Sequence, residues 1–72
     1  MKQQFVICVR NDSYEVSLET RKLYRVLPDA DAAQHGQIRV VDESGEDYLY
    51  PQDYFVQVDL PERVERAVLS AA

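Results

Sequence analysis

The chain is 72 residues long and carries a formal net charge of −5. That length fits one small domain, close to the lower size at which a chain folds without disulfides or metals. Its single cysteine, Cys8, excludes an internal disulfide and a zinc site built from cysteines. The acidic balance argues against nucleic-acid binding by bulk electrostatics, because neutralising phosphates requires clustered lysine and arginine.

The hydropathy of the chain predicts no membrane span, since no apolar run approaches the roughly 18 residues that a spanning helix needs. The N-terminal residues 1–4 lead directly into an expected strand and lack the apolar core and cleavage site of a signal peptide. We therefore expect a cytoplasmic protein without a membrane partner.

The first third of the chain predicts strands separated by polar turns. Residues 4–10 are rich in β-branched and aromatic side chains, which favour a strand. Residues 14–18 alternate in polarity, which predicts that Val16 and Leu18 point into the core. A second firm strand is expected over residues 22–27, with the same β-branched and aromatic character.

A short helical turn is expected between the second and third strands. Pro28 ends the preceding strand, because proline has no N–H for the ladder. Asp29 is placed to cap a turn over residues 30–34, and Gly36 follows where helices commonly end in a left-handed conformation. His35 has no second histidine or cysteine at ligand spacing, which predicts an exposed loop residue or a helix C-cap rather than a metal ligand.

The middle of the chain predicts a β-hairpin. The apolar residues 38–41 and the aromatic residues 48–50 flank a polar turn at residues 42–47. Within that turn, Gly45 suits a positive φ. The acidic side chains of the turn lack the ligand order of a calcium loop, so we expect no metal there.

The last third predicts one more strand and a terminal helix. A single turn over residues 51–54 precedes a strand over residues 55–58. Asp59 and Glu62 are spaced as a capping box around Pro61. Helical spacing predicts an apolar face toward the barrel, made by Leu60, Val64, Ala67 and Val68. The charged residues Glu62, Arg63, Glu65 and Arg66 are expected to face water.

Four segments together resemble the pattern of Src-homology-3 (SH3) domains. Residues 15–18 and 22–27 resemble the short polar–apolar segment of that family and the apolar strand that follows its charged turn. Residues 44–46 resemble the distal turn. Residues 51–56 are similar to the Pro-x-x-Tyr-Val element at the one-turn 3₁₀ helix.

This resemblance implies a mainly β fold, a small five-stranded SH3-like barrel over residues 1–59 with a short helical turn before the third strand. A C-terminal α-helix over residues 60–72 would pack on the barrel within a single domain. The whole chain also resembles a group of short bacterial proteins that carry the segments found here at residues 24–29 and 42–48, a group that brings no activity with it.

In SH3 domains the proline and tyrosine of the Pro-x-x-Tyr element line a groove for polyproline peptides, and Pro51 and Tyr54 match these positions. The family's tryptophan at the start of the third strand is missing, with Gln37 or Ile38 in its place. Because polyproline recognition depends on such aromatic side chains, the sequence disfavours it.

The tyrosines give the main binding hypothesis. Tyr14 and Tyr54 fall on turns, where exposure is expected, and Tyr48 and Tyr50 share one face of their strand. We predict a shallow aromatic patch that binds another protein through Tyr14, Tyr50, Pro51 and Tyr54.

An alternative is an accessory barrel for nucleic acid or ribonucleoprotein. Small barrels often bind nucleic-acid backbones on a strand face. Here the basic face would consist of Arg10, Arg25 and Arg39. The net acidity of the chain makes this nucleic-acid partner the less favoured one.

Catalysis is not expected. The serines and the single histidine lack a triad or a nucleophile-elbow context, and two glycines cannot form a phosphate-binding loop. We therefore predict a non-catalytic module for protein interaction or assembly, without cofactor or metal. The sequence leaves the partner and the oligomeric state open, including a subunit that self-association stabilises.

Overall fold

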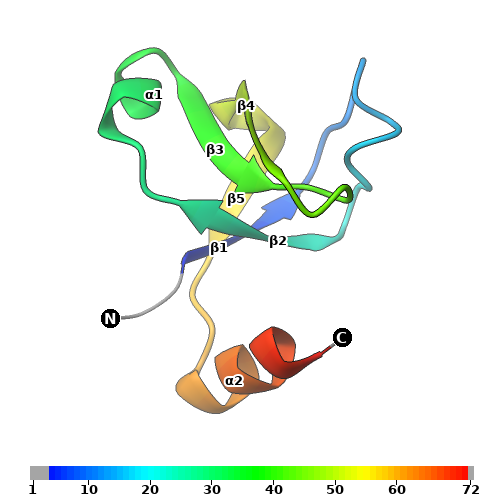
Figure 1. Cartoon of the computed structure of the whole chain (residues 1–72), viewed down its shortest axis with the longest axis vertical. Coiled ribbons are helices and arrows are strands. Elements are labelled where there is room, and N and C mark those ends of the chain that lie inside the picture. Colours follow the sequence, from blue (N-terminus) through cyan, green and yellow to red (C-terminus); the bar gives the residue numbers. More distant parts are fainter. Residues whose placement is uncertain (1–3, 72) are drawn as a thin grey trace.

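The computed structural model describes residues 4–71, so the parts of the expected domain at residues 1–3 and 72 lie outside the described residues. Five strands form one antiparallel sheet in the order β4-β3-β2-β1-β5 (Figure 1). The strands are β1 (Gln4–Cys8), β2 (Leu23–Leu27), β3 (Gln37–Val41), β4 (Asp47–Pro51) and β5 (Phe55–Val58).

Three short helices complete the described chain: α1 (Ala30–Gln34), the one-turn 3₁₀ helix η1 (Gln52–Tyr54) and α2 (Glu62–Ser70). The predicted mainly β fold with a C-terminal helix is confirmed. Closure into a barrel is not, because no ladder among residues 4–71 joins the edge strands β4 and β5. Neither α-helix has the length and apolar character needed to cross a bilayer.

Turn chemistry places the elements as the sequence predicts. Asp29 caps α1, since its carboxylate accepts a hydrogen bond from the Ala32 amide at 3.0 Å. Gly36 follows α1 with φ of 69°, and Gly45 lies in the β3–β4 turn with φ of 84°. Both angles lie in the left-handed region that glycine adopts without strain.

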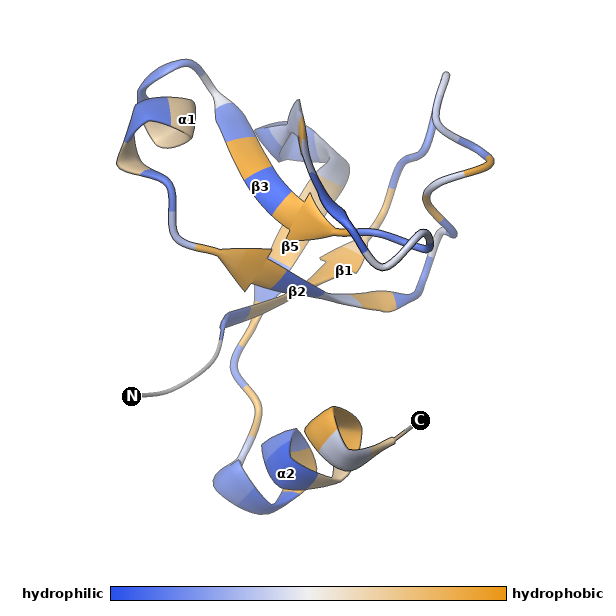
Figure 2. Ribbon diagram, in the orientation of Figure 1, coloured by the Kyte–Doolittle hydropathy of each residue, from blue (hydrophilic) through white to orange (hydrophobic). Residues whose placement is uncertain are grey.

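The inner face of the sheet carries the core. Side chains alternate between the two faces of each strand, and Figure 2 shows this alternation of polarity along β3. The inner face collects one apolar cluster of buried side chains: Val6, Cys8, Leu18, Tyr24, Val26, Val40, Tyr50 and Phe55.

The two edge strands meet through side chains instead of hydrogen bonds. The rings of Tyr50 on β4 and Phe55 on β5 lie edge to face, with centroids 6.1 Å apart. The amide of Val9 also donates to the Tyr54 carbonyl at 2.9 Å, which extends the β1–β5 ladder up to η1. The sheet therefore curls around its core and brings its edges together at η1.

Residues 14–18 do not form the predicted alternating segment. The Tyr14 carbonyl accepts hydrogen bonds from the amides of Ser17 and Leu18, at 3.0 and 2.9 Å, which makes this segment a helix-like turn. Side chains in such a turn do not follow a period of two. The buried position of Leu18 (1% exposed) is confirmed, whereas the inward position predicted for Val16 (95% exposed) is wrong.

Helix α2 lies against the outer face of the sheet, beside β1 and β2 (Figure 1). It shields Phe5, which points away from the inner core and is nevertheless buried. A groove of about 380 Å³ remains between helix and sheet, with Leu23 on one wall and Val68 and Leu69 on the other.

The start of α2 differs from the prediction. Asp59 is not its N-cap, because the helix begins at Glu62 and no side chain caps it. Pro61 immediately precedes the helix with ψ of 147°, an extended conformation that keeps it and the residues before it outside the helical turn. Pro61 therefore occupies the N-cap position predicted for Asp59, which lies two residues earlier.

The buried side of α2 is also rotated from the predicted one. Glu65 is buried rather than turned to water, and Ala67 is exposed rather than turned to the sheet. The helix meets the sheet along the side that carries Glu65 and Val68, three residues apart, which leaves Val64 at the margin of the contact.

Candidate functional site

Three tyrosines from different segments meet beside the curled edge of the sheet. Tyr14 begins the helix-like turn, Tyr50 lies on β4 and Tyr54 ends η1. The Tyr14 ring lies edge to face on the Tyr50 ring, with the ring centroids 5.0 Å apart and the ring planes at 87° to each other. The centroid of the Tyr54 ring lies 6.0 Å from that of Tyr14. The structure thus brings together three of the four residues of the predicted aromatic patch.

The exposure of these tyrosines is unequal. Tyr50 is 3% exposed and forms a buried floor, whereas Tyr14 is 36% exposed and lies above it. Pro51 is half-buried, and strand alternation turns it to the face of β4 opposite Tyr50. Pro51 therefore lies outside the exposed aromatic surface.

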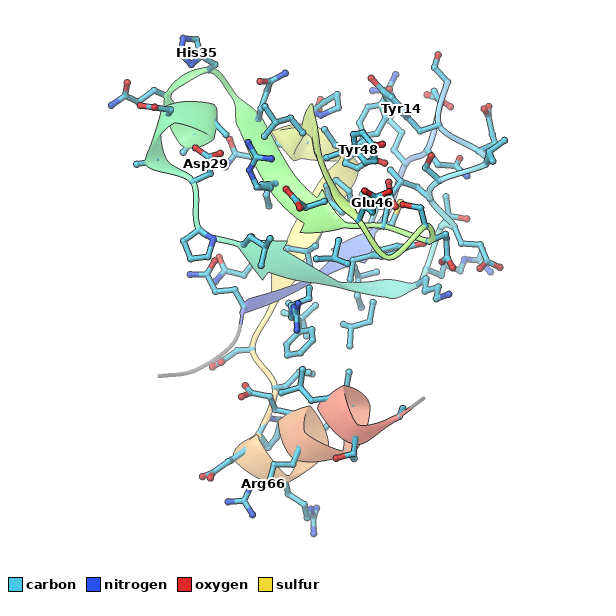
Figure 3. All side chains as sticks on the ribbon, viewed as in Figure 1. Tyr14, Asp29, His35, Glu46, Tyr48 and Arg66 are labelled. Carbon is cyan, nitrogen blue, oxygen red and sulfur yellow. The ribbon has the colours of Figure 1, made fainter. Side chains whose placement is uncertain are left out.

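Tyr48 is the exposed tyrosine that the predicted patch omitted. It is 54% exposed and shares its strand face with Tyr50. In Figure 3 the labelled side chains of Tyr14 and Tyr48 lie on the same side of the molecule. The two-residue spacing between Tyr48 and Tyr50 indicates in the sequence that both lie on one strand face. It does not indicate that Tyr14 approaches that face, because this contact joins distant segments of the chain.

A cleft of about 300 Å³ lies between the helix-like turn and β4. The exposed rings of Tyr14 and Tyr48 form its sides, and Asp42 and Ser44 of the β3–β4 turn form its polar end. The full lining is Tyr14, Ser17, Asp42, Ser44, Tyr48, Leu49 and Tyr50.

Asp42 is a buried carboxylate with a fixed set of donors. It is 6% exposed and accepts hydrogen bonds from the Ser44 amide at 2.9 Å, from the Ser44 hydroxyl and from the Tyr50 hydroxyl. Burial opposes its ionisation, but these hydrogen bonds outweigh burial and lower the pKa of Asp42. Burial and the bond to Asp42 raise the pKa of Tyr50 to about 12. At neutral pH the pair therefore keeps one proton arrangement, with tyrosine as donor.

A second tyrosine–carboxylate pair lies next to the first. The Tyr24 hydroxyl donates to Glu43 at 2.6 Å and accepts from the Glu19 amide at 2.8 Å. Lys22 also binds Glu43, at 2.6 Å, and the hydrogen bonds from Lys22 and Tyr24 lower the pKa of this carboxyl. The two pairs attach the β3–β4 turn, and hence one end of the cleft, to the core.

Arg10 extends the tyrosine cluster on its far side. Its guanidinium lies over the Tyr54 ring, 5.1 Å from the centroid, and its Nε contacts Asp12 at 2.6 Å. The Tyr54 hydroxyl donates to the Asp12 carbonyl at 3.1 Å. These contacts hold Tyr54 against the turn and satisfy the charge of Arg10.

The other two arginines of the proposed basic face lie in different surroundings. Arg39 binds Asp29 and Asp47, each at 2.8 Å, and these two carboxylates raise its pKa. Arg25 lines the groove beneath α2. Arg10, Arg25 and Arg39 thus lie in three separate surroundings, and Arg39 is bound to carboxylates.

Comparison with models of known protein families, with curated proteins and with solved structures gives no significant match to this chain. Across residues 4–71, no three histidine, cysteine, aspartate or glutamate side chains gather in a way that could hold a metal ion. The chemistry of the tyrosine-lined cleft therefore carries the functional argument.

Proposed function

We propose that this chain is an SH3-like protein-interaction module without catalytic activity. The SH3-like part of the proposal is supported by the strand order, by α1 before β3 and by η1 between β4 and β5. It is further supported by the contact of Tyr50 with Phe55, which curls the sheet toward a barrel. The resemblance of residues 51–56 to the Pro-x-x-Tyr-Val element falls at η1, where that family carries it.

The observation that carries the interaction role is the cleft between Tyr14 and Tyr48. Both rings are exposed and therefore accessible, and both combine an apolar body with a polar tip, as interface tyrosines do. Tyr14 is already ordered by its contact with Tyr50, so binding would require little further loss of side-chain entropy there. A partner protein would place a side chain in the cleft against the fixed polar end at Asp42.

Protein is preferred to nucleic acid as the partner because of the charges around the arginines. Arg10 and Arg39 already face carboxylates, so a phosphate would have to displace Asp12, Asp29 or Asp47. The net charge of −5 opposes the approach of a polyanion as well.

Selection of random peptides displayed on phage tests the proposal. We expect peptides enriched on the wild-type protein to lose binding to the double variant Tyr14→Ala/Tyr48→Ala. The matched control is Val9→Ala/Val56→Ala, which removes two comparably exposed apolar side chains elsewhere and should leave binding unchanged. Equal binding to wild type and to the tyrosine variant, or no enrichment over the tyrosine variant, would contradict the proposal.

A further inference from the structure

We propose that the partner of the Tyr14–Tyr48 cleft is an extended peptide that adds to the free edge of β4 as a further strand. This inference rests on the proposed interaction role and specifies the class of partner. It follows from the backbone of β4, whose outward-facing groups no element of residues 4–71 pairs.

Strand β4 is the last strand on its side of the sheet. Such an edge presents a row of backbone N–H and C=O groups that another extended chain can pair. Peptide recognition by strand addition uses these groups for affinity and pockets along the edge for specificity.

Two flanking hydrogen bonds determine the alternation along β4. The Asp42 amide donates to the Glu46 carbonyl at 3.0 Å, and the Gln52 amide donates to the Gly36 carbonyl at 2.9 Å. The first bond lies one register step beyond the pair Val41–Asp47, and the second lies one step beyond Gln37–Pro51. Hydrogen-bonded and non-hydrogen-bonded pairs alternate in an antiparallel ladder.

Both flanking bonds give β4 the same alternation of paired and outward-facing residues. Tyr48 and Tyr50 use their backbone groups to bind β3, whereas Asp47 and Leu49 point their N–H and C=O away from β3. No hydrogen bond within residues 4–71 occupies these two groups of Leu49. Pro51 contributes a carbonyl to the same edge but no N–H.

The side chains along this edge suit a strand-shaped ligand. Tyr48 is exposed and lines the cleft that Tyr14 closes on the other side, and Leu49 lines it from the strand edge, with its side chain on the opposite face of β4. A peptide paired with Leu49 would lie along the cleft and could direct every second side chain into it. The apolar walls favour an aromatic or aliphatic side chain at that position.

The charges along the edge favour a basic peptide. Glu46 is exposed in the turn that leads into β4 and is the carboxylate that a cation of the peptide can reach. Asp42, at the polar end of the cleft, is 6% exposed and already bound by Ser44 and Tyr50. Within residues 4–71 no ion pair neutralises Glu46, whereas Asp47 is bound to Arg39. The ligand class is therefore an extended segment with one apolar side chain and a nearby lysine or arginine.

The opposite edge of the sheet lacks the same features. Strand β5 exposes Val56 and Gln57, and its aromatic residue Phe55 is buried in the core. By the same alternation, the Val9–Tyr54 bond places the Gln57 N–H on the outer side of β5. Gln57 is thus the counterpart of Leu49 on an edge without an aromatic cleft.

The test uses peptides selected on the full chain from the phage library. Each is synthesised with single backbone N-methyl groups along its length, and binding is measured by fluorescence anisotropy. We expect N-methylation to weaken binding by about tenfold or more at every second residue and little at those between, because a strand pairs with an edge through alternate residues. This arm leaves the protein unchanged, so it does not depend on the folding of any variant.

The second arm removes one outward N–H from each edge of the sheet. Leu49→Pro should abolish peptide binding, and Gln57→Pro, the same change on β5, should not. Both prolines occupy edge positions whose N–H faces solvent, where proline is tolerated; circular dichroism checks that each variant folds. Leu49→Pro counts only if it is folded.

The outcomes separate this inference from the proposed function. Alternating N-methyl sensitivity, with loss of binding in a folded Leu49→Pro variant, supports strand addition. Peptides that need Tyr14 and Tyr48 but are indifferent to the N-methyl register overturn strand addition and leave the interaction role intact. Peptides that do not need the two tyrosines overturn both.

Discussion

Tyr50 donates its hydroxyl proton to Asp42 across the end of the β3–β4 hairpin, and both side chains are buried. Beside them, Tyr24 donates to Glu43. Two consecutive carboxylates of one turn are thus each bound to a tyrosine of the core. The conformation of this turn, which forms the polar end of the cleft, is therefore coupled to the packing of the sheet.

The first prediction concerns the Tyr50 hydroxyl. Tyr50→Phe should reduce the free energy of unfolding by roughly 1–3 kcal/mol, because buried Asp42 loses a donor while the ring remains. Urea denaturation measures the change. The control is Tyr48→Phe, whose ring is exposed and which should stay within about 0.5 kcal/mol of wild type. Equal stability of Tyr50→Phe and wild type would contradict the role given to this bond.

The second prediction concerns acid. The pKa values of Asp42 and Glu43 are lowered in the fold from ordinary values of 3.8 and 4.5. The folded state then binds fewer protons than the unfolded state. The stability that the two carboxylates contribute is therefore fully present at a pH above their ordinary pKa values, and it declines as the pH falls through and below these values. We expect the urea midpoint to fall between about pH 5 and pH 3.

The variant Glu43→Gln isolates one of these groups. It removes the ionisation of Glu43 while keeping a side chain that can accept from Lys22 and Tyr24. Its urea midpoint should therefore fall less steeply with acid than that of wild type. A wild-type midpoint that stays constant over this range, or an equal slope in the variant, would show that the lowered pKa of Glu43 does not stabilise the fold.

Local chemistry was sufficient to predict most of the elements. The cap at Asp29, the positive φ at Gly45 and the end of β2 before Pro28 each depend on one residue and its neighbours, and all three appear in the structure. Such features are predictable because the side chain that determines the conformation lies in the same segment.

Features that depend on contacts between distant segments were not predictable in this way. Val16 and Leu18 alternate as in a strand, but the hydrogen bonds of the Tyr14 carbonyl make a turn that buries only Leu18. Tyr48 was omitted from the binding patch because its cleft exists only where the turn at Tyr14 approaches β4. Periodicity reports which residues share a face and not which segment covers that face.

The third prediction tests the helix-like turn. Leu18→Ala should cost about 2–5 kcal/mol of unfolding free energy, because Leu18 is fully enclosed in the core and the substitution leaves a cavity. Val16→Ala, two residues away and almost fully exposed, should change stability by less than about 0.5 kcal/mol. Thermal or urea denaturation compares the two. Equal losses would mean that residues 14–18 form the alternating strand expected from the sequence.

The fourth prediction concerns nucleic acid. Fluorescence anisotropy with a labelled single-stranded oligonucleotide at low salt should show no saturable binding, since Arg10 and Arg39 are bound to carboxylates and the chain carries a net negative charge. Low salt is the condition most favourable to such binding. Saturable, salt-sensitive binding that Arg25→Ala weakens would instead favour the basic-face alternative.

The last prediction tests how α2 meets the sheet. Val68 lines the groove above Phe5 and Leu23, whereas Ala67, its neighbour in the chain, is exposed. Val68→Asp should lower the unfolding free energy by roughly 1–3 kcal/mol, because it replaces the apolar contacts of a half-buried valine with a side chain that prefers water. Ala67→Asp places the same charge in the same helical turn, so its effect on the helix dipole is matched and its cost should be clearly smaller. A greater loss for Ala67→Asp would show that α2 presents to the sheet the side predicted from its apolar spacing, in which Ala67 faces inward.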